Sequence, residues 1–283
     1  MLLHPTNENK NEAVLLLSHS GQPLIYKKGG KRVDLSGFFK RVEHYITVPF
    51  CVHCKRRLDF GMRVFCADCL SRYQNVKLRS CSRCASVLSK CTCTSDYLDT
   101  HLVHKLIKIV RYVSSIDDLP QNRLIFSLKR ENREDVAEFC AEELAAAITA
   151  GVDDLSDFVL SYVPRRPKNR RKYGVDQARI LAEHIGKLLN IPVVRALRSR
   201  ARASQKKLNA QERKANAVFV PKRGVDLSGK RVLLVDDIVT TGASMGSAAF
   251  ALRSIGAKEI VGVCFAIAYR DPYVPFEKPP YQA

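Results

Sequence analysis

Eight cysteines within residues 51–93 constrain the fold more than any other feature of this 283-residue sequence. Three pairs have the C-x-x-C spacing and the last has the spacing C-x-C: Cys51 and Cys54, Cys66 and Cys69, Cys81 and Cys84, Cys91 and Cys93. A C-x-x-C turn points two thiolates at one tetrahedral centre, so two pairs complete a shell of four thiolates. The pattern predicts two structural zinc ions. In the simplest arrangement, the first and second pairs bind one ion and the third and fourth pairs bind the other. A cross-brace, in which the first pair joins the third and the second joins the fourth, has the same stoichiometry.

The cysteine-rich segment holds few large apolar side chains, so metal binding should supply its folding energy. The C-x-C pair is the least regular half-site. His101 or His104 is the alternative ligand if that pair does not bind, although both are expected on a following helix. Cys140 and Cys264 lie in apolar stretches and are predicted to be buried packing residues.

Basic residues exceed acidic ones, 47 Lys and Arg against 28 Asp and Glu, giving a formal net charge of +19. Residues 165–223 hold 18 basic and three acidic residues, and residues 51–93 hold nine and two. This clustering favours anionic partners such as nucleic acid or phosphorylated small molecules. The longest uncharged apolar run covers residues 260–269, about half of the roughly twenty that a membrane span needs. No span and no signal peptide are predicted, and the expected location is cytoplasmic.

Beyond about residue 100, apolar strands alternate with helical patterns. Such alternation predicts an α/β fold with a parallel sheet covered by helices on both faces, and ligands then bind at the carboxyl ends of the strands. Residues 102–113 are apolar at helical spacing and could run into a strand. Strands are predicted at residues 158–163, 193–194, 217–220, 232–235 and 259–266, and helices at residues 135–148, 176–189 and 244–255.

The end of the strand at residues 232–235 carries the strongest chemical signal. Asp236 and Asp237 follow the apolar run, and then a short loop leads into a helix through Thr240, Thr241, Gly242, Ala243 and Ser244. The loop's N–H groups and hydroxyls can surround a phosphate at a helix N-terminus, and the two carboxylates can accept hydrogen bonds from vicinal hydroxyls. This combination predicts a ribose 5-phosphate site.

Residues 231–244, RVLLVDDIVTTGAS, resemble the phosphoribosyl-pyrophosphate (PRPP) signature of type I phosphoribosyltransferases. The sequence VPRRPKNRRKYGVDQ, from Val163, is similar to the stretch in which the ComF/GntX family has V-P, several arginines and then R-G-F-N-Q. Here Val175 and Asp176 stand at the family's Phe and Asn. The family's R…Q…L…R…N…F pattern is matched by Arg200, Gln205, Leu208, Arg213, Asn216 and Phe219.

Cysteine knuckles ahead of such a domain also characterise ComF (ComFC-like) proteins. The resemblance implies a double zinc-ribbon module over residues 46–97 and a phosphoribosyltransferase-like domain over residues 98–270. Residues 1–45 and 271–283 remain an unassigned extension and a tail.

The resemblance also implies roles for individual residues. PRPP would bind with Mg²⁺, with Asp236 and Asp237 as the catalytic clamp on the ribose and residues 240–244 around the 5-phosphate. Arg165 and Arg166 would receive pyrophosphate. A flexible loop would close the site with Arg200, Arg202, Lys206, Lys207 and Arg213. Nucleic acid would contact Arg170, Arg171 and Lys172.

Three functional hypotheses stay open. The first is a PRPP-binding protein of natural competence that handles single-stranded DNA, with the competence helicase or other competence proteins as partners. The second is an active phosphoribosyltransferase, a pentosyl-transferring enzyme, with an unidentified acceptor. The third is a PRPP-sensing regulator without turnover.

Overall fold

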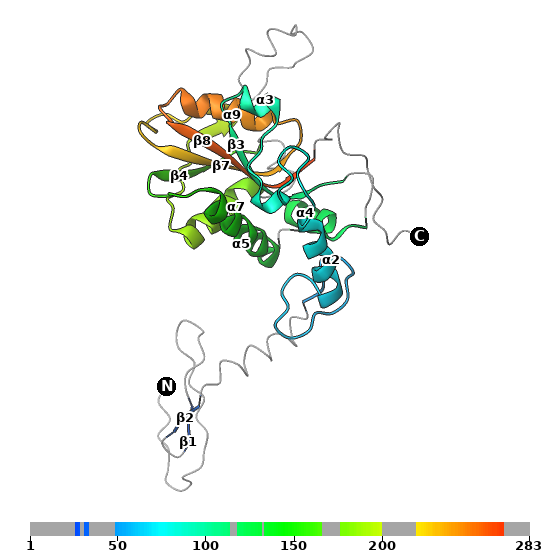
Figure 1. Cartoon of the computed structure of the whole chain (residues 1–283). Coiled ribbons are helices and arrows are strands. Elements are labelled where there is room, and N and C mark those ends of the chain that lie inside the picture. Colours follow the sequence, from blue (N-terminus) through cyan, green and yellow to red (C-terminus); the bar gives the residue numbers. More distant parts are fainter. Residues whose placement is uncertain are drawn as a thin grey trace, which may run out of the picture. The chain divides into compact units, whose positions relative to one another are not determined.

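A computed structural model describes residues 26–28, 31–33, 49–113, 118–131, 133–165, 176–199 and 219–268 (Figure 1). The chain divides into two compact units, one of residues 1–51 and 56–66 and the other of residues 52–55 and 67–283. In the first unit, two short strands, β1 (Tyr26–Lys28) and β2 (Lys31–Val33), pair antiparallel.

The second unit is built on a four-stranded parallel sheet with the strand order β3-β8-β7-β4. Its strands are β3 (Lys105–Arg111), β4 (Phe158–Tyr162), β7 (Arg231–Val239) and β8 (Glu259–Ile267). The two inner strands, β7 and β8, are apolar almost without interruption because both faces of the sheet are covered. The predicted parallel α/β class is confirmed.

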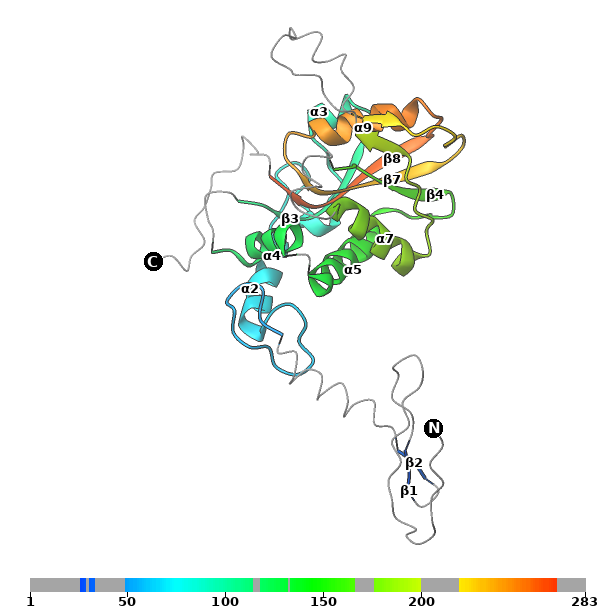
Figure 2. The same cartoon turned by 180° about the vertical axis from the view of Figure 1, so that it is seen from behind.

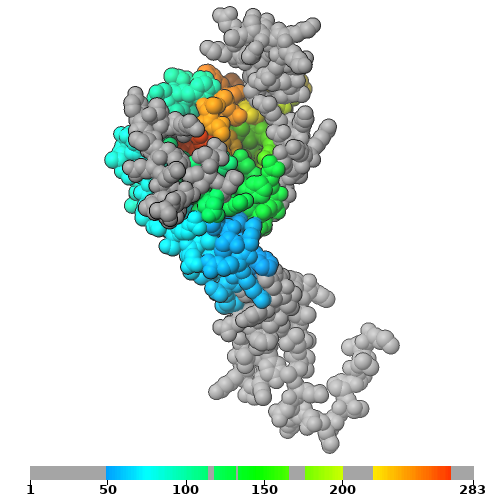
Figure 3. Space-filling view, turned by 90° about the vertical axis from the view of Figure 1, so that its right-hand side faces the viewer, coloured from blue at the N-terminus to red at the C-terminus, as the bar shows by residue number. Residues whose placement is uncertain are grey.

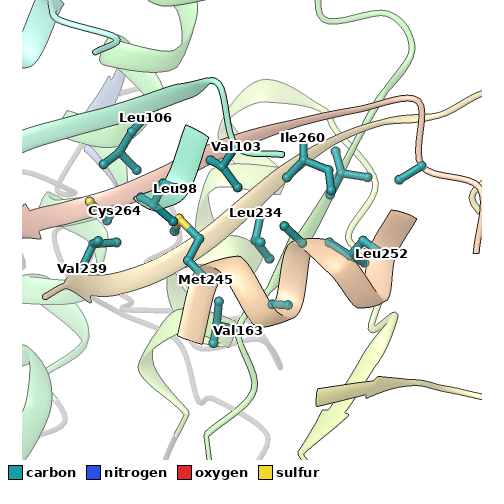
Figure 4. Packing of buried hydrophobic residues seen from close by; sticks show 14 of the residues in the cluster. Leu98, Val103, Leu106, Val163, Leu234, Val239, Met245, Leu252, Ile260 and Cys264 are labelled. Carbon is teal, nitrogen blue, oxygen red and sulfur yellow. The ribbon is translucent and has the colours of Figure 1, made fainter. Parts of the chain in front are cut away.

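Helices cover both faces of this sheet (Figures 1 and 2). Two helices lie on one face: α5 (Glu134–Gly151) and α7 (Gln177–Leu189). The other face carries α9 (Ala243–Arg253) and the short helix α3 (Asp96–Asp99). The core beneath α9 consists mainly of aliphatic and sulfur-containing side chains, among them Leu98, Met245 and Ile260 (Figure 4).

Smaller elements complete the unit. The helix α2 (Ala67–Lys77) packs against α4 (Pro120–Arg130), and a short 3-10 helix, η1 (Leu88–Lys90), contacts β3. An antiparallel pair, β5 (Leu197–Ser199) and β6 (Phe219–Pro221), packs against α9. Within the described part of the chain, no helix is both long enough and apolar enough to cross a membrane.

Two sequence-based assignments differ from the structure. Residues 105–111 form the strand β3, although their apolar spacing resembles a helix, because five consecutive residues are buried between the two helical layers. The predicted strand at residues 193–194 is reduced to one parallel bridge, between Val193 and Leu160. The helices α2 and α4, the 3-10 helix η1 and the strand β5 were not predicted.

Gly186 marks a close approach between α7 and the chain that follows it. A Cβ atom at Gly186 would lie 2.7 Å from Val193 Cγ2 and 2.9 Å from the Ile191 carbonyl oxygen. Gly186→Ala should therefore destabilise the fold by about 1–3 kcal/mol through overpacking, although alanine is the better helix former. Thermal unfolding should show a lower Tm for this variant, whereas the exposed neighbour change Lys187→Ala should leave it nearly unchanged. An equal or higher Tm for Gly186→Ala would contradict this close packing.

Candidate functional site

The strand β7 delivers two adjacent carboxylates to the carboxyl edge of the sheet. Asp236 pairs in register with Cys264 of β8, and both Asp236 and Asp237 are half-buried. The Asp237 N–H donates to Asp236 Oδ1 at 2.8 Å, and the Ile238 N–H donates to Asp237 Oδ1 at 2.7 Å. These bonds fix both side chains close to the backbone that carries them.

The loop after β7 turns directly into α9. Gly242 has a φ of 79°, a left-handed conformation that favours glycine, and it is the N-cap of α9. The Ala243 N–H donates to Thr241 Oγ1 at 3.4 Å. The first N–H groups of a helix lack intrahelical acceptors and carry partial positive charge, so this loop end suits an anion.

A pocket of about 270 Å³ opens at this edge of the sheet. Residues from the end of β4, the start of α7, β6, the end of β7 and the start of α9 line it: Val163, Pro164, Arg165, Asp176, Gln177, Ala178, Phe219, Asp236, Asp237, Ile238 and Ser244. The pocket thus gathers acidic, basic and hydroxyl side chains from segments more than 70 residues apart in the sequence.

Hydrogen bonds tie the basic side of this pocket together. The Arg165 N–H donates to Asp176 Oδ2 at 3.0 Å, and the Arg165 guanidinium donates to Gln177 Oε1. Gln177 Nε2 donates to the Lys129 carbonyl oxygen at 3.3 Å, and the Lys129 ammonium lies 3.6 Å from Asp237 Oδ2. The network links α4, α7 and the ends of β4 and β7.

Burial and like charge perturb the acidic side. Burial raises the pKa of Asp236 well above its usual range, and the neighbouring Asp237 carboxylate raises it further. Burial also raises the pKa of Asp176, against the opposing effect of its bond from the Arg165 N–H. Burial in the pocket thus disfavours the charged form of both Asp236 and Asp176.

The structure brings Arg165, Asp236, Asp237 and Ser244 to one pocket. Of the predicted phosphate loop, Ser244 lines this pocket, whereas residues 240–243 are not among its lining residues. Lys129 was missed by sequence reasoning because it lies on an unpredicted helix. Asp176 and Gln177 were noted only as part of a family motif. The remaining predicted site residues lie outside the described residues: Arg166, Arg170, Arg171, Lys172, Arg200, Arg202, Lys206, Lys207 and Arg213.

The eight cysteines gather into two groups, and the pairing is consecutive. The first cluster is Cys51, Cys54, Cys66 and Cys69, and the second cluster is Cys81, Cys84, Cys91 and Cys93. The four sulfur atoms of each cluster lie within 4.8 Å of one another. Thiolates on one zinc ion are separated by about 3.8 Å, given Zn–S bonds of about 2.3 Å, so each donor set suits a tetrahedral Zn²⁺.

Polar groups surround the sulfur atoms. His53 Nδ1 lies 3.2 Å from Cys69 Sγ, and Arg56 donates to Cys66 Sγ at 3.7 Å. Lys108 of β3 donates to Cys91 Sγ at 3.2 Å. Hydrogen bonds of this kind orient thiolate ligands and offset their charge.

The other predicted candidates lie apart from these clusters. His101 and His104 lie beyond the end of α3, so the expectation that both lie on a helix was wrong. Their Nδ1 atoms lie 2.6 Å from the Tyr97 carbonyl oxygen and 2.8 Å from Asp99 Oδ1, respectively. The Cys140 and Cys264 side chains are fully buried, as predicted for packing residues.

Comparison with known proteins matches the part of the chain that includes β7 and α9 to a known domain family. The family model for the phosphoribosyl transferase domain matches residues 172–282. The DNA utilization protein YhgH of Escherichia coli K12 is 27% identical over 229 residues, which is 77% of this chain and 97% of that protein. Competence protein F of Haemophilus influenzae is 24% identical over 223 residues, 74% of this chain and 93% of that protein.

Two further matches are partial. Competence protein ComFC of Bacillus subtilis is 27% identical over 148 residues, covering 49% of this chain and 60% of that protein. A solved structure of the allosteric regulatory enzyme of purine biosynthesis is 18% identical, with a TM-score of 0.36 over 50% of this chain and 30% of that chain.

The C-terminal part of the chain is thus a phosphoribosyltransferase-type domain, by its matched family model and its parallel sheet. The relatives named as competence and DNA-utilization proteins, together with the two cysteine clusters, fit the ComF family that the motifs predicted.

The raised pKa of Asp236 makes a prediction about stability. The folded state binds a proton at Asp236 that the unfolded chain releases above about pH 4, so this group lowers stability as pH rises through that range. Asp236→Asn removes the effect and should raise the Tm at pH 7, with the gain shrinking as pH falls toward 4. Thermal unfolding across this pH range measures it, with exposed Asp153→Asn as the control. A gain that is equal at pH 4 and pH 7 would count against burial as its cause.

Proposed function

We propose that this protein binds PRPP with Mg²⁺ in the pocket at the end of β7. The observation that carries the proposal is that one pocket joins the Asp236–Asp237 pair to Ser244 at the start of α9 and to Arg165. The match to the phosphoribosyl transferase family model supports it. A sugar phosphate with a charged leaving group needs this set: hydroxyl acceptors, an anion-binding helix start and a cation.

Each part of the pocket suits one part of the ligand. Asp236 and Asp237 would accept hydrogen bonds from the ribose hydroxyls. Residues 240–244 would surround the 5-phosphate with N–H and hydroxyl donors. Arg165, with Arg166, would face the pyrophosphate, and Mg²⁺ would neutralise part of its charge. The basic residues of the segment that follows Ser199, named above as a flexible loop, would exclude water from the closed site.

We further propose that the two cysteine clusters each hold a structural Zn²⁺ ion, and that the protein acts on single-stranded DNA in natural competence. The names of the competence and DNA-utilization relatives and the net charge of +19 support the second part. Single-stranded DNA is an extended polyanion, so the basic stretches at residues 51–93 and 165–223 are the expected contacts.

The ligand proposal predicts a loss of binding from a nearly isosteric change. Asp236→Asn combined with Asp237→Asn keeps side-chain size but replaces one oxygen of each carboxyl group by an NH₂ group, which cannot accept a hydrogen bond from a ribose hydroxyl. Affinity for Mg²⁺-PRPP should therefore fall below detection in calorimetry. The Asp153→Asn control should bind as the unchanged protein does. Equal affinity of the double variant and the unchanged protein would refute the assignment. Pyrophosphate release from PRPP, with and without single-stranded DNA, then separates an enzyme from a sensor.

The DNA proposal predicts strong salt dependence. Binding by phosphate neutralisation gives a log–log slope of about −0.7 per contact on single strands. Changing Arg170, Arg171 and Lys172 to Ala should weaken binding and flatten that slope by about 1.5–2, corresponding to two or three contacts. Fluorescence anisotropy at several salt concentrations measures both, with Lys230→Ala and Lys258→Ala, outside the basic stretches, as the control. Binding that ignores salt, or no binding at low salt, would exclude this mode.

A further inference from the structure

The segment that leaves the second cluster packs directly beneath the loop at residues 240–244. It runs from Cys93 through Thr94 and the N-cap Ser95 into α3, whose Leu98 is fully buried. A Cβ atom added at Gly242 would lie 2.8 Å from Leu98 Cγ and 3.2 Å from Tyr97 Cδ1. The left-handed turn that starts α9 therefore rests on α3, and Figure 3 shows cyan α3 beside orange α9 at the surface.

One arginine located between two cysteines of the second cluster is hydrogen-bonded to the start of α3. Arg83 lies between the ligands Cys81 and Cys84, and its guanidinium donates to the Thr94 carbonyl oxygen at 2.9 Å and to Asp96 Oδ1 at 2.7 Å. Arg83 also donates its own N–H to Cys81 Sγ at 3.4 Å. The turn that positions two sulfur atoms thus also positions the first residues of α3.

A buried lysine holds the other half of the second cluster against the sheet. Lys108 of β3 is only 1% exposed, and its ammonium donates to the carbonyl oxygens of Cys91 and Cys93 at 3.1 and 2.7 Å. It also reaches Cys91 Sγ. A fully buried lysine is rare unless its donors are satisfied, and here the cysteine segment supplies the acceptors. The backbone joins them too, since the Leu106 N–H donates to the Thr92 carbonyl oxygen at 2.9 Å.

The first cluster has different neighbours. His53, which contacts Cys69, lies 3.0 Å from Asp118 Oδ1 through its other nitrogen. Lys55 lies 3.7 Å from Glu131 in an exposed pair. These contacts lead to the two ends of α4 and not to α3.

We propose that the second cluster supports the conformation of the loop at residues 240–244, and that Arg83 and Leu98 act as positioning residues. The ion in this cluster fixes the Arg83 turn, Arg83 fixes α3, and α3 holds the loop in the conformation that receives a phosphate. The ion in the first cluster does not have this role. The inference rests on the proposed function for the identity of the ligand, but the ordering of the loop is independent of any ligand.

The test compares the two clusters in the full-length protein. Cys51→Ser with Cys54→Ser, and Cys81→Ser with Cys84→Ser, should each reduce bound zinc from two ions to one by elemental analysis. Hydrogen exchange followed by mass spectrometry then reports on residues 240–246. Exchange there should become at least about tenfold faster only when the second cluster is changed. Without that cluster the loop loses its support, so local opening of these residues costs less free energy. Equal exchange in the two double variants would overturn the proposal.

A milder variant guards against general unfolding. Arg83→Gln keeps all eight cysteines but loses the charge-assisted bonds to α3, so zinc should stay at two ions while exchange at residues 240–246 rises about tenfold. Arg79→Gln, an exposed arginine of the same segment, should change neither quantity. An Arg83→Gln variant with unchanged exchange would also overturn the proposal.

Binding separates this inference from the proposed function. Mg²⁺-PRPP affinity should fall in parallel with the faster exchange, in Arg83→Gln and in the second-cluster variant but not in the first. If the unchanged protein binds no PRPP, the proposed function fails, and hydrogen exchange alone still decides whether the second cluster supports the loop.

Discussion

The placement of β7 between β4 and β8 is the constraint on which the site depends. Its register pairs Val235 with Tyr162 of β4 and with Val263 of β8, whereas Asp236 is paired on the β8 side, with Cys264. The apolar run therefore ends where the pairing with β4 ends. A one-residue shift would turn every side chain of the strand to the opposite face. Burial on both faces makes such a shift costly. The hydrogen-bonded register of β7 that stabilises the domain therefore also sets the positions of the two carboxyl groups.

This arrangement has an electrostatic cost, because adjacent carboxyl groups at a half-buried strand end repel each other and lose hydration. The structure offsets part of that cost with cations from other segments. Lys129 lies beside Asp237, and Arg165 is bonded to the residues that open α7. The opposed charges suit the proposed ligand, which carries hydroxyls at one end and phosphates at the other.

The sequence was sufficient for those parts of the site that are continuous in the chain. The apolar run before Asp236 and the glycine turn at Gly242 predict a strand, a loop and a helix start, because each depends on local backbone preferences. Lys129 could not be found in this way, since only tertiary packing brings α4 to the end of β7. The strand β3 was predicted only as a continuation of a helical pattern, because Val103, Leu106, Ile107 and Val110 repeat at helical spacing and Lys108 interrupts the apolar run.

The contacts of Lys108 also show that the cysteine-rich segment is more than a separate stabilising element. A thiolate cluster carries negative charge, and a sheet edge carries unpaired backbone groups, so each is unfavourable when buried alone. Here the cluster's carbonyl and sulfur acceptors satisfy a lysine from the edge strand β3, and the Thr92 carbonyl satisfies a backbone N–H at that edge. Because each side completes the hydrogen bonds of the other, the second cluster and the sheet form one packed structure. A few residues after Cys93, Leu98 packs against the turn at Gly242.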